Sequence, residues 1–410
     1  MISIPDSSTL IPQTHGHYQI YRSTTTDLIR LDLLFEAGSA YQPQPLCASA
    51  ANKLCTVATR DMDSAALSEF MDYRGVIVET NCEVLQNAIT VYMLRRYADE
   101  VLPIVANMLS CPSFAENDFR PWQAKRRHEI LANEQRSAIQ ARRLFYEALF
   151  GVNHPLGRHA EASDVDRLSI DTVRSYFFEK SSSPTGIILA GNIDDEIFNI
   201  LNSCCFNIVS RSSALTSLSP STKPNAEAIL HHQIQNSVQT TLRVGRVIPM
   251  AWDSLDYARL MLAVTVLGGY FGSRLMSNLR EDKGYTYGIY ARTQIYRGTM
   301  VFYITADVAA GTAKKAIDEI MKELRRLCDE PIMDDELQLV KTVMTGDFLR
   351  SVDGIFERAA RYADMVGCDI NERFTDNLRE ILINATPAEI QHVANMYLKP
   401  EDMVVCTAGA

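Results

Sequence analysis

Arg280 and Tyr287 are two side chains with hydrogen-bond donors that lie seven residues apart in the chain. The pattern of residues 275–281 predicts a helix, and the Lys-Gly pair at 283–284 predicts a turn after it. Apolar and aromatic residues then alternate over 285–289, which predicts a β-strand. An arginine at the end of a helix and a tyrosine on the next strand can therefore project to one place.

The same two residues also have a structural interpretation. Arg280 can pair with Glu281 or Asp282 at the surface while Tyr287 only packs. Spacing alone favours this interpretation, because pairs of neighbouring surface charges are common. The surrounding sequence GGYFGSRL at 268–275 favours the functional interpretation instead.

Metal ligands form no recognisable group in the sequence. No CxxC pair occurs, and no two histidines are four residues apart, as ligands on one helical turn would be. The nine cysteines are scattered and lie mostly in apolar runs, which indicates buried, reduced thiols in a cytoplasmic protein. We therefore expect no metal site in this chain.

The elements that carry these residues occur twice. Residues 169–191 and 386–409 each read as a helix cap, a short amphipathic helix, a turn with a proline and an apolar strand ending in glycine. The two segments are offset by 386 − 169 = 217 residues at the start and by 409 − 191 = 218 at the end. The chain therefore reads as one unit repeated.

Further pairs of segments support the repeat. Strand-like runs at 88–94 and 300–306 each precede an amphipathic helix, and long helical regions are expected near 116–150 and 334–380. The fold class predicted is α+β, with two homologous domains that are each an antiparallel sheet with helices on one face. The predicted boundaries are a first domain at 1–209, a linker rich in Ser, Thr and Pro at 210–228, and a second domain at 229–410.

Length and composition agree with two globular domains. The chain has 410 residues, 47% of them hydrophobic and 22% charged, and its net charge is −10. A chain this acidic is not expected to bind nucleic acid, because neutralising phosphates supplies most of that affinity. The first residues lack the basic and apolar regions of a signal peptide, and no apolar run reaches the length of a membrane span. We expect a cytoplasmic protein with no membrane partner.

Four segments carry a resemblance to a known family. The most specific is LGGYFGSRLMSNLREDKGYTY, which is similar to a second-domain signature in which the arginine and tyrosine above are fixed positions. The chain resembles the insulinase/pitrilysin zinc peptidases, in particular their bacterial branch that is similar to the mitochondrial processing peptidase. The resemblance covers nearly the whole chain and implies that family's LuxS/MPP-like metallopeptidase fold. The segments are Leu34–Pro43, Tyr73–Thr90, Leu149–Gly157 and Leu267–Tyr287.

The catalytic motif of that family is missing. Active members carry H-x-x-E-H on a helix, with two zinc-binding histidines and a glutamate as general base. Counting from the GSAYQP turn places the motif on Ala51, Leu54 and Cys55, none of which is the expected residue. The third ligand of the family, a distal glutamate, is expected near Glu134, one position out of register.

The resemblance also assigns the residues that remain. In the family the Arg–Tyr pair hydrogen-bonds the substrate carbonyl and the developing oxyanion, so Arg280 and Tyr287 are expected to support the transition state. The family binds extended peptides on a strand edge, whose counterpart here is expected at Val76, Ile77, Val78, Glu79, Thr80 and Asn81.

Together these features predict a non-catalytic subunit of a two-chain zinc metallopeptidase. The expected partner is a paralogue with H-x-x-E-H, or a second copy of this chain, and the expected ligand is a peptide substrate. The zinc is expected in the catalytic partner, and this chain is expected to be inactive alone. A structural or peptide-binding homologue without a peptidase role is the alternative. A metalloenzyme that uses Cys55 and Glu134 is a less favoured one.

Overall fold

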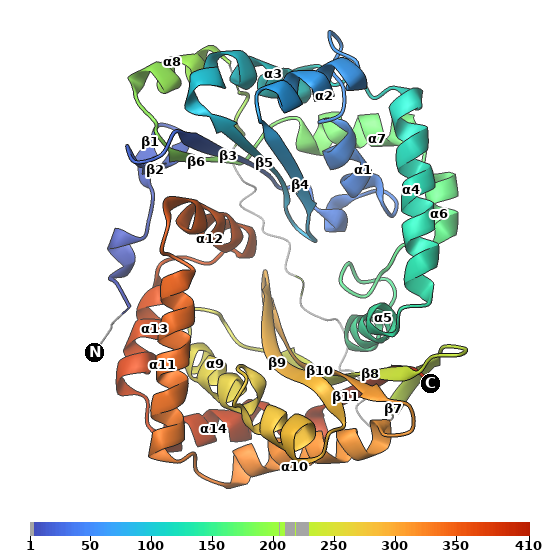
Figure 1. Cartoon of the computed structure of the whole chain (residues 1–410), viewed down its shortest axis with the longest axis vertical. Coiled ribbons are helices and arrows are strands. Elements are labelled where there is room, and N and C mark those ends of the chain that lie inside the picture. The colour runs from blue at the N-terminus through green and yellow to red at the C-terminus, as the bar shows by residue number, and fades with distance from the viewer. Residues whose placement is uncertain (1–3, 205, 210–217, 219–228) are drawn as a thin grey trace.

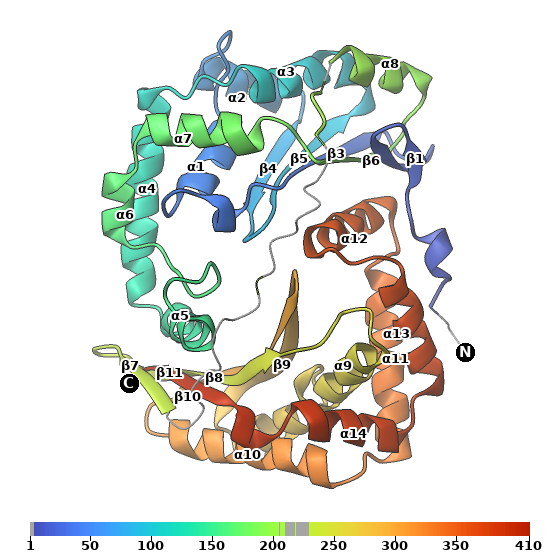
Figure 2. The same ribbon diagram turned by 180° about the vertical axis from the view of Figure 1, so that it is seen from behind.

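The computed structural model describes residues 4–204, 206–209, 218 and 229–410. The chain forms two halves, each built on a β-sheet, and the inner faces of the two sheets are turned toward each other (Figures 1 and 2). The strands of one half all precede the predicted linker, and those of the other half all follow it. The linker itself, 210–228, lies outside the described residues except for Leu218.

The first sheet has six strands in the order β1-β2-β6-β3-β5-β4. Strands β2 and β6 are parallel, and the other neighbours are antiparallel. β3 is the central strand of the core, because all of its residues after the first are buried. The strands are β1 Gln13–His15, β2 Tyr18–Arg22, β3 Leu28–Phe35, β4 Ile77–Cys82, β5 Asn87–Leu94 and β6 Gly186–Gly191.

Helices of the first half cover the outer face of this sheet (Figure 1). The first N–H groups of a helix have no partner within the helix, and side chains cap them here. Asp63 accepts from Ala66 N, and Ser169 accepts from Thr172 N. The helices are α1 Cys47–Leu54, α2 Ser64–Tyr73, α3 Ala98–Ser110, α4 Glu116–Glu134, α6 Ala162–Arg167, α7 Ile170–Tyr176 and α8 Asp195–Ser203.

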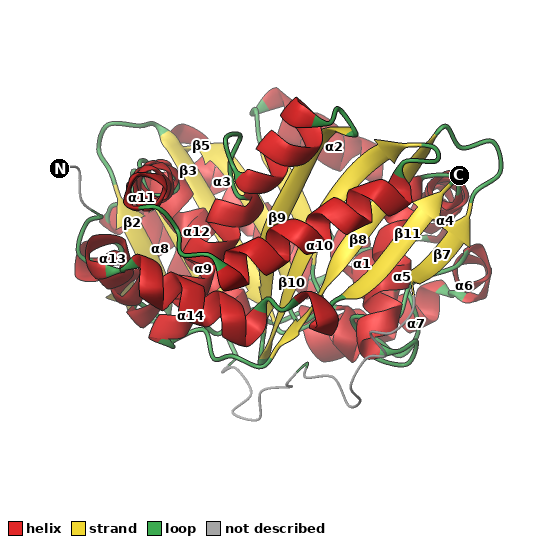
Figure 3. Ribbon diagram, turned by 90° about the horizontal axis from the view of Figure 1, so that it is seen from below, coloured by secondary structure: helices red, strands yellow, loops and turns green. Residues whose placement is uncertain are grey.

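The second sheet has five strands in the order β7-β11-β8-β10-β9. Figure 3 shows α10 and α14 on its outer side. The strands are β7 Ile229–Gln233, β8 Gln239–Ile248, β9 Thr286–Tyr296, β10 Thr299–Ala309 and β11 Val404–Gly409. The helices are α9 Leu255–Gly268, the short helix η5 Met276–Asp282, α10 Ala313–Asp329, α11 Asp334–Arg350, α13 Arg373–Asn384 and α14 Pro387–Tyr397.

The repeat predicted from the sequence is visible in both sheets. β6 and β11 are offset by 404 − 186 = 218 residues, and β2-β6-β3-β5-β4 follows the same order as β7-β11-β8-β10-β9. The α+β class is confirmed. The sheets differ from the prediction in having one parallel pair each, β2 with β6 and β7 with β11. Such pairs join strands that lie far apart in the chain, so short-range patterns do not reveal them.

The two halves exchange one helix each. α5 Ser137–Phe150 of the first half packs on β8 and β11 of the second sheet, and α12 Ile355–Cys368 of the second half packs on β2, β3 and β6 of the first sheet (Figure 1). The two helices are equivalent in the repeat, since 355 − 137 = 218 and 368 − 150 = 218. Each covers an apolar inner face: Phe145 is fully buried with Val301 and Val404, and Ala359 with Leu34 and Ile188.

The long helical regions predicted from the sequence are divided. The region 116–150 forms α4 and α5, which are separated at Gln135 and Arg136, and the region 334–380 forms α11, α12 and the first part of α13. The break after α4 turns the chain toward the other half, so it makes the helix exchange possible. Among the described residues, no helix is both long enough and apolar enough to span a membrane.

Candidate functional site

Helix α1 carries the positions predicted for the degenerate metal motif. Ala51 and Cys55 are fully buried and Leu54 is 3% exposed, and all three pack in the core of the first half. Burial raises the pKa of the Cys55 thiol to about 12, and its Sγ donates to Asn52 O at 3.4 Å. A metal ligand must be the thiolate, so Cys55 keeps its proton at neutral pH and is unsuited to hold zinc.

The other face of α1 lines a cavity of about 580 Å³. Ser49, Asn52, Lys53 and the edge of Leu54 contribute this face, and the first three have the i, i+3, i+4 spacing of H-x-x-E-H. The geometry therefore favours a motif register two residues earlier than the one counted from the GSAYQP turn. The opposite walls come from β4 and α4, which contribute Thr80, Cys82, Trp122 and Glu129 among others.

The acidic residue on α4 that faces this cavity is Glu129, not Glu134. Glu134 is the last residue of α4 and is exposed to solvent. Glu129 lies five residues earlier, and its carboxylate pairs with Arg126 at 3.1 Å. Five residues correspond to about one and a half helical turns, so the two side chains point in different directions.

These residues do not fit a zinc ion. Zinc sites use His, Cys or carboxylate ligands, and catalytic sites use three of them. The cavity face of α1 instead offers a hydroxyl, an amide and an ammonium group, with Glu129 as the one carboxylate near the expected third position. Within the residues that the structure describes, no group of three or more His, Cys, Asp or Glu residues is placed to hold a metal.

Asn52 replaces the general base in this register and is anchored by the sheet. It is 2% exposed, and its Nδ2 donates to Asn81 O at 2.8 Å and to Ala88 O at 3.2 Å. Its Oδ1 is buried and has no hydrogen-bond partner among the described residues. A buried acceptor without a partner costs free energy, so this oxygen is available to an N–H from a ligand.

The predicted peptide-binding edge is an edge strand in the structure. β4 is the last strand of its sheet and pairs only with β5 among the described strands. Val76 lies just before the strand and is 7% exposed, whereas Ile77 is 57% exposed. The remaining predicted positions are all within β4, so the geometry of the edge agrees with the prediction and peptide binding itself stays a prediction.

Backbone groups of alternate residues on β4 point away from β5. Glu83 N donates to Gln86 O at 2.8 Å in the hairpin, which fixes the alternation of hydrogen-bonded and non-hydrogen-bonded pairs along the strand. Val78, Thr80 and Cys82 therefore turn their N–H and C=O groups to the open edge. Thr80 and Cys82 also line the cavity beside α1.

Arg280 and Tyr287 lie on consecutive elements of the second half, as predicted. η5 ends at Asp282, Gly284 has φ +62°, and β9 begins at Thr286. The Arg280 guanidinium lies over the Phe271 ring at 4.6 Å, and the described part of the chain shows no ion pair for it with Glu281 or Asp282. Tyr287 is 91% exposed.

Tyr287 does not follow the predicted alternation of β9. Ile289 is fully buried although it is two residues from the exposed Tyr287. The cause is an irregularity in the pairing of β9 with β10, where Ala306 faces Ile289 but Val308 faces Thr286. The irregular turn of the strand separates the phenol from the core face and presents it to solvent.

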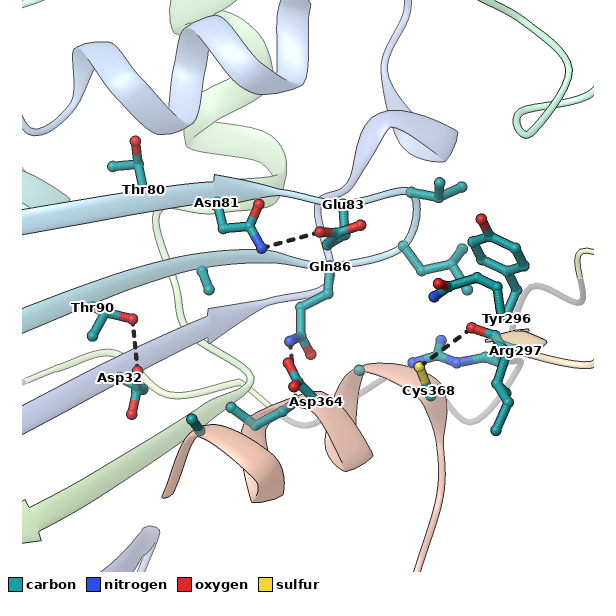
Figure 4. Close-up of a pocket in the computed structure, with 18 of the residues that line it drawn as sticks. Asp32, Thr80, Asn81, Glu83, Gln86, Thr90, Tyr296, Arg297, Asp364 and Cys368 are labelled. Atoms are coloured by element: carbon teal, nitrogen blue, oxygen red, sulfur yellow. Dashed lines mark hydrogen bonds between the residues drawn. The ribbon is translucent and has the colours of Figure 1, made fainter. Parts of the chain in front are cut away.

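A second cavity, of about 850 Å³, lies between the two halves (Figure 4). Gln86 reaches from the hairpin after β4 to α12, where its Nε2 donates to Ala363 O at 3.4 Å. On the floor, Arg30 and Asp32 form a buried pair at 2.8 Å, and Arg297 pairs with Glu36 at 3.0 Å. Neither Arg280 nor Tyr287 is among the residues that line this cavity.

Comparison with known proteins shows which family the chain resembles. Residues 175–344 match the family model described as the peptidase M16 inactive domain. The non-peptidase homolog YmxG of Helicobacter pylori is 21% identical over 295 residues, covering 70% of this chain and 67% of that protein. The chain therefore resembles the M16 peptidase family. The uncharacterized zinc protease YmxG of Bacillus subtilis is 24% identical over 272 residues, covering 66% of this chain and 65% of the relative.

The fold comparison extends over nearly the whole chain. The crystal structure of a peptidase M16 inactive domain from Pseudomonas fluorescens has a TM-score of 0.83 at 18% identity, and covers 96% of this chain and 95% of its own. The aligned sequences of the two relatives span only about two thirds of those proteins. The family resemblance is thus confirmed, and the family model that matches is described as the inactive domain.

Four residues of the candidate site were not found by sequence reasoning. Ser49, Asn52, Lys53 and Glu129 face the cavity, although the motif was placed on the buried side of α1. The amphipathic pattern of α1 contained the signal, because its apolar residues lie on the opposite side of the helix. Small alanines and cysteines make that pattern weak. The motif was therefore placed by counting residues from the preceding GSAYQP turn.

Proposed function

We propose that this chain is the non-catalytic subunit of a two-chain zinc metallopeptidase. It supplies Arg280 and Tyr287 and one half of a closed chamber, while a partner with H-x-x-E-H supplies the zinc and the general base. The observation that carries this proposal is the contrast between α1, which lacks zinc ligands, and the Arg–Tyr pair, which is kept, with Tyr287 exposed.

The exposed position of Tyr287 suits action on a group outside the chain. Tyr287 is 91% exposed, and Arg280 is oriented by stacking over Phe271. A guanidinium and a phenol are both hydrogen-bond donors, so together they can stabilise an oxyanion that develops in the partner's active site. Holding Arg280 on an aromatic ring limits its rotamers before the partner binds, which lowers the entropic cost of using it.

Two kinds of partner are compatible with the proposal. A paralogue with H-x-x-E-H gives a heterodimer with one active site, whereas a second copy of this chain gives a homodimer without one. Closing a chamber buries the rim of each subunit, so the interface is expected to be large. A cytoplasmic location stays a prediction.

Reconstitution with an H-x-x-E-H homologue tests the proposal. Hydrolysis of a peptide is compared for each chain alone and for the mixture, and activity is expected in the mixture. Arg280→Ala and Tyr287→Phe are each expected to lower kcat by about 10²–10³ without loss of association, because each removes a donor to the oxyanion.

Matched controls come from exposed residues of the same types elsewhere. Arg350→Ala and Tyr73→Phe remove the same groups at positions where the side chain of Arg350 is 76% exposed and Tyr73 is 79% exposed. Both are expected to leave the rate unchanged. Hydrolysis by this chain alone that a chelator abolishes would falsify the division of labour.

The alternative is a structural or peptide-binding homologue with no part in peptide hydrolysis. The name of the Helicobacter pylori relative, a non-peptidase homolog, favours it. In that case the Arg280 and Tyr287 variants have no effect on any activity of the mixture, although the two chains still associate.

A further inference from the structure

The groove beside α1 has a charge opposite to that of the chain as a whole. The 580 Å³ cavity adjoins a second one of about 300 Å³, because both are lined by Ser49, Cys82 and Arg126; the two together are called the groove. The whole chain has a net charge of −10. Within the described residues, the basic side chains of this lining that make no ion pair are Lys53, Lys125 and Arg158.

Acidic residues of the groove do not cancel this charge. Glu129 is already paired with Arg126 at 3.1 Å. Asp118 is then the carboxylate left to oppose three cationic side chains. The groove is therefore a local positive site on an acidic protein, and it favours anionic ligands over cationic ones.

The groove also offers hydrogen bonds of a kind that a peptide backbone satisfies. Asn52 is only 2% exposed, and its Oδ1 is an acceptor without a partner among the described residues. Val78, Thr80 and Cys82 present backbone N–H and C=O groups at the open edge of β4. Only an extended peptide offers both donors and acceptors at the spacing of a strand.

We infer that this groove binds an extended peptide with acidic side chains, an inference that deepens and rests on the proposed peptide-binding role. The peptide adds to β4 as a further strand, and one of its N–H groups reaches Asn52 Oδ1. Its carboxylates lie near Lys53 and Lys125 on one side and Arg158 at the far end. Alternate side chains of a strand share a face, so acidic residues at every second position suit the groove best.

Binding to this chain alone tests the inference. Fluorescent peptides of about ten residues, the upper length of an ordinary strand, alternate Val with Glu, Ser or Lys, and fluorescence polarisation gives their Kd values. The Glu peptide is expected to bind about tenfold more tightly than the Ser peptide and to lose this advantage at high salt, because exposed charges are screened. Equal affinity for the Glu and Ser peptides overturns the inference.

Charge-reversal variants locate the effect. Lys53→Glu combined with Lys125→Glu is expected to weaken the Glu peptide by about tenfold and to leave the Ser peptide within about twofold. The control, Lys314→Glu with Lys315→Glu on exposed positions of α10, makes the same change in net charge and is expected to alter neither. Equal losses of affinity for both double variants would show that the whole chain attracts anions, and would overturn the inference that the acidic peptide binds in the groove.

A proline variant tests the strand edge separately. Thr80 turns its N–H away from β5, so Thr80→Pro removes a donor to the peptide but no bond within the sheet. This variant is expected to lose binding of all three peptides, whereas Thr80→Ala keeps it. Undiminished binding to Thr80→Pro, or equally tight binding of polyacrylate, overturns recognition of a peptide backbone.

The outcome is independent of the reconstitution experiment. If the chain shows no preference for acidic peptides while the mixture still hydrolyses peptides through Arg280 and Tyr287, the inference fails and the proposed function stands. If acidic peptides bind and the mixture is inactive, the inference about the groove stands and the proposed two-chain function fails.

Discussion

Restoring the metal motif in the register favoured by the geometry should create a zinc site. The triple variant Ser49→His, Asn52→Glu and Lys53→His places three new side chains on the face of α1 that lines the 580 Å³ cavity, opposite Glu129. Two histidines and Glu129 are then available as ligands, which is the ligand set of many zinc peptidases. We expect one zinc per chain with a Kd of about 10⁻⁶ M or tighter, or about 8 kcal/mol.

The cost of this variant is small compared with that of the other register. Asn52→Glu removes the amide that bonds Asn81 O and Ala88 O, at about 1–3 kcal/mol for two carbonyls left without that donor. In contrast, Ala51→His, Leu54→Glu and Cys55→His insert large polar groups where the residues are 0%, 3% and 0% exposed. Overpacking costs about 1–3 kcal/mol at each site, before any charge is buried.

The second variant therefore loses about 5 kcal/mol or more, a large part of the 5–15 kcal/mol that stabilises a typical domain. We expect it to be unfolded or insoluble. The first variant should fold, and zinc at a hundredfold excess over Kd should raise its stability by about 2.7 kcal/mol. Zinc content after dialysis, competition with a chelator, and thermal unfolding with and without zinc measure these quantities.

Adding Glu129→Gln to the first variant is the matched control. It should weaken zinc by more than the 10–100-fold that is typical of an outer-shell partner, whereas adding Glu134→Gln should have no effect. The reasoning is refuted if the variant at 51, 54 and 55 folds and binds zinc, or if Glu134 proves to be the ligand.

Two further predictions concern the body of the chain. Asp32→Ala should lower the free energy of unfolding by about 3–5 kcal/mol in urea titrations, because it leaves Arg30 buried without its partner. The control Asp347→Ala, at the exposed pair with Arg350, should cost about 0–1 kcal/mol. Equal losses of stability for the two variants would contradict this prediction. Iodoacetamide at pH 8 should leave Cys55 unmodified in the folded chain, because the thiol is buried and its pKa of about 12 keeps the thiolate scarce at that pH. In urea the same reagent should modify Cys55. Alkylated Cys55 in mass spectra of native samples would refute its buried state.

Short-range patterns predicted the elements of each half well. The caps expected at Ser169 and Thr386 are both present, and Thr386 forms a capping box with Glu389. The strand-like runs 88–94 and 300–306 lie within β5 and β10. These features depend on neighbours along the chain, so the sequence displays them directly.

Features that depend on distant residues were not predicted. The parallel pairing of β2 with β6 and the helix exchange involve partners far away in the sequence, and the irregular pairing near Tyr287 involves the next strand, β10. The register of α1 failed for a related reason. It was counted from a turn whose length relative to other family members the sequence does not give, and the side of the helix that is buried depends on the sheet beneath it.

The helix exchange has a consequence for how the molecule is held together. α5 and α12 occupy equivalent positions in the repeat, and each fills a hydrophobic gap that its own half leaves open. One half produced by itself would therefore carry a helix with no surface to dock on and a sheet with no cover. Two copies of that half could solve both problems by trading helices with twofold symmetry, so an isolated half is expected to dimerise where the intact chain needs no such help.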